Sequence, residues 1–142
     1  MSTNSNIGIR YENGQIDSIY CHWDGGFDHN GQILAESYND VEKVRELIEL
    51  GDISSLGNHI ASDDPSKHTF DSPEPGVTVA YHRDRGEPLC VSRDCCEDEF
   101  KDSEYSYLFD VVKNRWFFSY EGCPFINLVS CVNYQMLNTN KC

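Results

Sequence analysis

Residues 7–23 decide the fold and read IGIRYENGQIDSIYCHW. Apolar and polar residues alternate at the start of this stretch, as they do in a strand that buries one face. The pair Asn13-Gly14 then favours a tight turn, because both residues tolerate positive φ. Apolar residues return on the far side of the turn. The stretch therefore predicts a hairpin of two antiparallel strands, at residues 6–11 and 16–22.

Two helices are predicted after the hairpin. The first covers residues 32–37, with Asn30 as its expected N-cap. The second covers residues 40–50, with Asn39 as its expected N-cap and Glu42 three residues later in the capping-box position. One face of this second helix carries apolar residues at helical spacing, which are Val41, Val44, Leu47 and Ile48.

The rest of the chain predicts shorter elements separated by polar segments. They are a helical turn at 53–56, a loop at 61–76, a strand at 77–82, a hairpin at 105–109 and 116–120, an apolar segment at 126–132 and a tail at 133–142.

This order of elements lacks the strand–helix alternation that builds a parallel sheet. We therefore expect an α+β protein with a single antiparallel sheet of about five strands and two or three helices packed on one face. The length of 142 residues suits a single domain over residues 1–142.

The charge of the chain restricts its partners. Twenty-four acidic residues against 11 basic ones give a formal net charge of −13. Direct binding to nucleic acid or to an anionic membrane is not expected, because both require clustered Lys and Arg. The charge favours a protein with a basic surface, a bound cation, or simple solubility.

The cysteines and the first residues indicate a compartment. The seven cysteines are an odd number, and Cys95 and Cys96 are adjacent, so free thiols fit better than a disulfide framework. Met1–Asn6 is polar and does not resemble a signal peptide, and no apolar run approaches the ~20 residues of a membrane span. We expect a cytoplasmic protein without a cofactor.

The segment Tyr20–Gly25 carries the most unusual local chemistry, since it places a thiol, an imidazole, an indole and a carboxylate at a strand end. The residue types that bind metals here and just beyond are His22, Asp24, Asp28 and His29. Their spacing matches no closed zinc pattern, so no metal site is predicted. The alternative is that Tyr20 and Trp23 pack while His22 and Asp24 bond locally.

A thiol nucleophile at Cys21 would need a base. Neighbours on a strand point to opposite faces, so His22 cannot pair with Cys21 directly, and another histidine such as His82 would be required. An enzyme is therefore the least favoured reading.

A second candidate group surrounds the only close pair of arginines, Arg83 and Arg85. Together with Tyr81 they have the chemistry to hold a phosphate or stack on a base. The alternative is that both pair with nearby acids such as Asp84 and Glu87. The candidate ligand-binding residues are His22, Trp23, Asp24, Tyr81, His82, Arg83 and Arg85.

The third candidate is an acidic run at residues 94–104, which we expect on an exposed loop or short helix. Its carboxylates make a candidate surface for a basic partner. They are Asp94, Glu97, Asp98, Glu99, Asp102 and Glu104.

One string, Tyr-Cys-His-Trp-Asp-Gly within residues 19–25, is specific, and it is supported by residues 5–9 and by segments 29–34, 50–57 and 80–87. On these residues the chain resembles a family of small proteins found in bacteriophages and mobile elements. The resemblance fades after the hairpin of residues 105–108 and Trp116. The chain departs from the family at Gly26-Phe27, where Tyr-Pro is common, and in its cysteine-rich 90–96 stretch.

The resemblance implies a viral accessory protein that acts in the cytoplasm of a bacterial host. With the charge, it leads us to expect an inhibitor of a host defence system that docks on a host protein with a basic surface. The alternatives are a sponge for a small nucleotide signal and, last, a small cysteine/histidine enzyme.

Overall fold

The structure, a computed structural model, describes residues 3–128. Its first two strands, β1 (Ser5–Arg10) and β2 (Ile16–Cys21), pair antiparallel along their whole length and confirm the predicted hairpin. Gly14 adopts a φ of +89° in the turn. Side chains rarely tolerate that conformation, which explains the glycine at this position.

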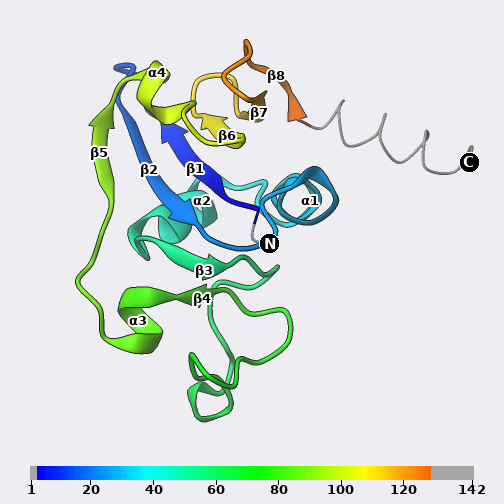
Figure 1. The fold of residues 1–142 in the computed structure, drawn as a ribbon, viewed down its shortest axis with the longest axis vertical. Coiled ribbons are helices and arrows are strands. Elements are labelled where there is room, and N and C mark those ends of the chain that lie inside the picture. Colours follow the sequence, from blue (N-terminus) through cyan, green and yellow to red (C-terminus); the bar gives the residue numbers. More distant parts are fainter. Residues whose placement is uncertain (1–2, 129–142) are drawn as a thin grey trace, which may run out of the picture.

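The hairpin lies at the centre of one eight-stranded sheet (Figure 1). The other strands are β3 (Ile53–Ser55), β4 (Val79–Ala80), β5 (Ser92–Cys95), β6 (Tyr105–Asp110), β7 (Arg115–Tyr120) and β8 (Ile126–Asn127). The strands follow the order β4-β3-β2-β1-β6-β7-β8, and β5 pairs with part of β2.

The α+β class is confirmed, but the predicted antiparallel sheet of about five strands is wrong in two respects. The sheet has eight strands, because β3, β5 and β8 join those that were predicted. It is also mixed, since β1 pairs in parallel with β6, and β2 pairs in parallel with β3 at Cys21 and Ile53. Parallel strands need a long connection, and here residues 11–104 connect β1 to β6 and residues 22–52 connect β2 to β3.

Two helices pack on one face of the sheet. They are α1 (Gln32–Ser37) and α2 (Val41–Glu49), and both lie where the sequence predicts them. The apolar residues of α2 recur at the period of a helix, so they form one stripe. This stripe packs against β1 and β2. The fully buried core there includes Ile7, Ile9, Leu34, Val44, Leu47 and Ile48.

The N-cap of α2 is Asp40 and not the predicted Asn39. The side chain of Asp40 accepts a hydrogen bond from the N–H of Glu42 at 3.2 Å. Asn39 instead donates through Nδ2 to the carbonyl of Glu36, at the end of α1. Asn and Asp both cap helices well, so the local sequence does not decide between Asn39 and Asp40.

Asn30 does not cap α1, contrary to prediction. It lies inside a π-helical turn (Phe27–Gly31) and is fully buried. Its Nδ2 donates to Ser5 Oγ at 3.2 Å and to Cys21 Sγ at 3.3 Å. Asn30 therefore ties this turn to the ends of β1 and β2.

Two predictions in the middle of the chain are wrong. Residues 53–56 form no helical turn, because β3 occupies that segment. The predicted strand at 77–82 ends at Ala80, and α3 (Tyr81–Arg85) follows it. Asp84 Oδ2 accepts a hydrogen bond from the N–H of Ala80 at 2.8 Å, which satisfies a donor at the start of α3.

A fourth helix lies on the opposite face of the sheet, so the prediction that the helices share one face is also wrong. It is α4 (Glu97–Phe100), and Phe100 is its buried residue. Side chains alternate along β1, so Gly8 faces away from α1 and α2. The ring of Phe100 covers Gly8 and packs beside Ile16 and Leu108.

The C-terminal part of the described chain forms the second predicted hairpin, β6 and β7, with Asn114 at a φ of +53° in its turn. Of the predicted apolar segment, residues 126–127 pair with β7 as β8; positions 129–132 and the expected tail at 133–142 lie outside the described residues. The loop at 61–76 contains one 3-10 turn. No helix among residues 3–128 is long and apolar enough to cross a membrane.

Candidate functional site: an acidic groove on the sheet

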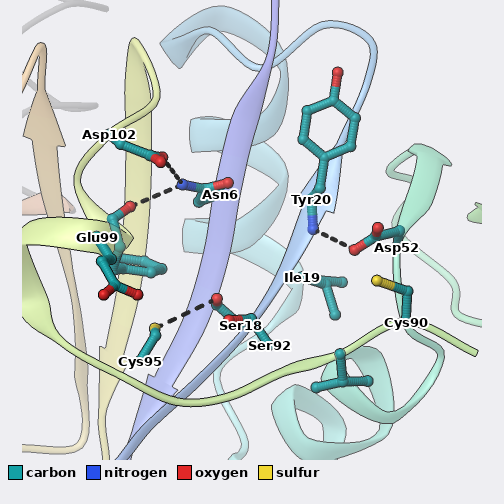
Figure 2. A pocket seen from close by; sticks show the side chains of 12 residues that line it. Asn6, Ser18, Ile19, Tyr20, Asp52, Cys90, Ser92, Cys95, Glu99 and Asp102 are labelled. Carbon is teal, nitrogen blue, oxygen red and sulfur yellow. Dashed lines mark hydrogen bonds between the residues drawn. The ribbon is translucent and has the colours of Figure 1, made fainter.

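A groove of about 500 Å³ lies on the α4 face of the sheet (Figure 2). Its floor is formed by side chains of β1 and β2 that alternate away from the main core, namely Asn6, Ser18 and Tyr20. One wall is the end of α4 and the turn after it. The other wall is β5, the segment that leads into it, and Asp52 before β3.

The groove is acidic. The twelve residues that line it include the carboxylates Asp52, Glu99 and Asp102, and none of the twelve is Lys, Arg or His. Nearby cations are engaged elsewhere: Arg93 pairs with Glu49 and Asp17, and Lys101 lies over the ring of Phe125.

Asn6 presents its acceptor end to the groove. Its Nδ2 donates to the carbonyl of Phe100 at 2.8 Å and to Asp102 Oδ1 at 3.0 Å. Both partners are acceptors, which fixes the orientation of the amide. The oxygen of Asn6 therefore points away from α4 and toward the side where Tyr20 lies (Figure 2).

Asp52 closes a gap along the edge of β2. That edge pairs with β5 as far as Ser18 and with β3 from Cys21 onward, so the N–H of Tyr20 lies between two partners. Asp52 Oδ1 accepts a hydrogen bond from this N–H at 2.9 Å. The backbone N–H of Asp52 in turn donates to the carbonyl of Cys90 at 3.0 Å, so this one residue joins three segments.

Two thiols line the groove, and the pKa of each is raised above its ordinary value. The negative charge of Asp52, together with a hydrogen bond to its carboxylate, raises the pKa of Cys90. Burial raises the pKa of Cys95, whose Sγ lies 3.7 Å from Ser18 Oγ. Neither thiol has the lowered pKa that marks a reactive cysteine.

Cys21 is also unsuited to nucleophilic attack. It is fully buried, and burial raises its pKa to about 11. Its Sγ donates to the carbonyl of Trp23 and accepts from Asn30. His82, the base considered from the sequence, is exposed, and its Nδ1 is 2.6 Å from the carbonyl of Glu87.

The structure divides the predicted acidic surface. Glu99 and Asp102 line the groove, whereas Asp94 and Glu97 line a neighbouring hollow that shares Cys95 with it. Glu97 also pairs with Arg10 at 3.7 Å. The other two predicted carboxylates, Asp98 and Glu104, line neither hollow.

The predicted ligand-binding residues form several separate arrangements. The hydroxyl of Tyr20 is 2.9 Å from His22 Nδ1, and the His22 and Trp23 rings meet edge to face at 4.6 Å. Burial, and then the proximity of Tyr81, raises the pKa of Tyr20. Asp24 lies in a different hollow beside His29.

Arg83 forms its hydrogen bonds with other residues of the chain. Its guanidinium donates to the carbonyls of Ile60 and Thr78, both at 2.6 Å, and to the carboxylate of Asp84. This matches the alternative reading, in which the arginine pairs with a nearby acid.

Arg85 is also paired. It forms an ion pair with Glu87 and lies over the rings of Phe70 and Tyr81, at 4.3 and 5.0 Å from their centroids. Its charge is therefore largely balanced within its own segment.

The candidate metal ligands point to different partners. His22 bonds to Tyr20, and His29 Nδ1 lies 2.9 Å from Asn30 Oδ1. Over the described part of the chain, no group of three or more His, Cys, Asp and Glu side chains is arranged to hold a metal ion.

Sequence reasoning missed Asn6 and Asp52, which are unremarkable in their own segments, and it noted the Tyr20–Gly25 segment without giving Tyr20 a binding role. The three residues meet only because β2 pairs with β1 on one side and β3 on the other. The chain matches no protein-family model, no curated protein and no solved structure.

Proposed function

We propose that the chain is a binding protein that docks through its acidic groove on a basic surface of another protein. The observation that carries this proposal is the lining of the groove, with three carboxylates and no cationic side chain. The net charge of −13 adds long-range attraction toward a basic partner.

The two other functions have weaker support. A nucleotide would bring phosphates to a groove lined by carboxylates, and the candidate arginines Arg83 and Arg85 already pair with Asp84 and Glu87. An enzyme would need an activated nucleophile, whereas the pKa values of Cys21, Cys90 and Cys95 are all raised.

The nature of the partner follows from the resemblance. A small accessory protein of a bacteriophage would act in the cytoplasm of a bacterial host, and its docking would inhibit a host defence protein. The support for this step is the resemblance carried by residues 19–25, 50–57 and 80–87.

A pull-down from bacterial lysate at low and physiological salt tests the proposal. The wild-type chain is compared with a groove variant, D52N/E99Q/D102N, and with a control variant, E12Q/E36Q/E46Q, which removes the same number of charges at exposed positions outside the groove. We expect captured proteins that are released by salt and lost in the groove variant but retained by the control.

Two results would contradict the proposal. Equal loss in both variants would mean that total charge and not the groove attracts the partner. Capture that is unchanged by salt and by all six substitutions would mean that the carboxylates take no part in binding.

A further inference from the structure

We infer that the groove receives one arginine side chain from an extended basic segment of the partner. This inference rests on the proposed function and names the chemistry that the groove recognises. The floor and walls offer hydrogen-bond acceptors on several sides, and an aromatic ring stands among them (Figure 2).

The groove supplies several hydrogen-bond acceptors to a ligand. The donor end of Asn6 is consumed by Phe100 and Asp102, so its oxygen remains for a ligand. The carboxylate of Asp52 accepts from the N–H of Tyr20 and from the Cys90 thiol, and a carboxylate has acceptor positions beyond those two bonds. Glu99 adds a second carboxylate from the opposite wall. The complement of such a lining is a positively charged group that carries only donors.

The positions of the acceptors favour an arginine side chain over a lysine side chain. A guanidinium has five N–H donors in one plane and no acceptor, whereas an ammonium concentrates three donors at one point. Acceptors on both walls suit the wider group. The ring of Tyr20 stands at the end of the groove next to Asp52, and a flat guanidinium stacks on an aromatic face better than an ammonium does.

The volume of the groove is larger than one guanidinium needs. A volume of about 500 Å³ exceeds what one guanidinium fills and is typical of sites that hold a short segment or a small organic ligand. The carboxylates do not gather into a metal-binding group within residues 3–128. The groove therefore suits an arginine together with the peptide backbone on either side of it.

The test is a titration of the full chain, labelled with ¹⁵N, at low salt and followed by NMR. The probes are acetyl-Gly-Arg-Gly-amide and two matched peptides with lysine or citrulline in place of arginine. We expect the arginine peptide to shift the side-chain amide of Asn6 and the backbone amide of Tyr20. The lysine peptide should bind several-fold more weakly, and the neutral citrulline peptide should cause no saturable shift.

Variants locate the site. Asp52→Asn keeps an acceptor for the N–H of Tyr20 while removing the charge, and it should weaken arginine binding about tenfold. Glu99→Gln, on the exposed surface of α4, should weaken it as well. Tyr20→Phe should retain binding and Tyr20→Leu should reduce it, because only leucine removes the aromatic face. Glu46→Gln, exposed on α2, is the matched control and should change nothing.

Equal binding of all three peptides, or shifts confined to residues outside the groove, would overturn the inference. So would Asp52→Asn and Glu99→Gln variants that bind as the wild type does. If a salt-sensitive host partner is captured but the arginine peptide does not bind, the inference fails while the proposed function stands. If the peptide binds but no partner is captured, the proposed function fails and the arginine site remains.

Discussion

The ring of Phe100 lies directly on Gly8, so closely that a Cβ at position 8 would lie 2.6 Å from Phe100 Cε1. This contact seats α4 on the face of the sheet opposite α1 and α2. The bond from Asn6 to the carbonyl of Phe100 holds the same turn from the neighbouring strand position. Together they fix the wall of the groove that carries Glu99 and Asp102.

Gly8→Ala should therefore destabilise the protein by about 1–3 kcal/mol, because the buried ring has to move. Urea denaturation measures the free energy of unfolding. The cost should shrink in a Phe100→Leu background, where a smaller side chain leaves room for the methyl group. Costs that simply add in the double variant would show that the two residues are not coupled.

Arg83→Lys should cost about 2 kcal/mol, because one ammonium cannot reach the carbonyls of Ile60 and Thr78 and the carboxylate of Asp84 together. Hydrogen exchange should quicken across residues 61–76. Arg85→Lys is the control and should cost less, under about 1 kcal/mol, since its ion-pair partner is exposed and a lysine still places a cation near the rings of Phe70 and Tyr81. Equal effects of the two changes would rule out a structural role specific to Arg83.

The parts of the fold that the sequence predicts are those with strong local signals. The first hairpin has alternating apolar and polar residues and an Asn-Gly turn. The helix α2 has an apolar stripe, and Gly51 follows its C-terminal end. The missed elements depend on distant partners. β3 is a strand because it pairs with Cys21, and α3 begins where Asp84 takes the N–H of Ala80.

The candidate site follows the same rule. Glu99 and Asp102 belong to a run whose charge density is visible in the sequence, so they were predicted as surface carboxylates. Asn6, Tyr20 and Asp52 come from three separate segments that only the sheet brings together. Pairing over long distances decides the groove, and no local pattern encodes it.

Stability should fall in acid through two buried carboxylates, Asp84 and Asp17. Burial alone would raise their pKa values, but hydrogen bonds outweigh it and hold both below the ordinary 3.8. For Asp84 the donors are Arg83, the N–H of Ala80 and His68.

The sign follows from proton linkage. A carboxylate whose pKa is lower in the folded state contributes stability above its unfolded pKa and loses it as the pH falls through the folded pKa. The free energy of unfolding should therefore decrease below about pH 4. Asp84→Asn should be less stable at pH 7 and lose less stability between neutral and acidic pH. Urea melts at several pH values check this, and an unchanged acid slope in that variant would contradict it.

The two thiols of the groove report on different carboxylates. The charge and hydrogen bond of Asp52 raise the pKa of Cys90. Burial raises the pKa of Cys95 first, and the charge of Glu99 adds to it. Because alkylation proceeds through the thiolate, its rate at fixed pH measures each local field separately.

Asp52→Asn should accelerate alkylation of Cys90 by iodoacetamide at pH 8 by about two- to fivefold and leave Cys95 unchanged. Glu99→Gln should do the reverse, with a smaller increase at Cys95, because burial dominates there. Mass spectrometry of the alkylated peptides separates the sites. Cys21, fully buried with a pKa of about 11, should stay unmodified in every folded variant and serves as the internal control. If both substitutions accelerated both thiols equally, the carboxylates would not lie on opposite walls, and the acceptor arrangement proposed for arginine would be wrong.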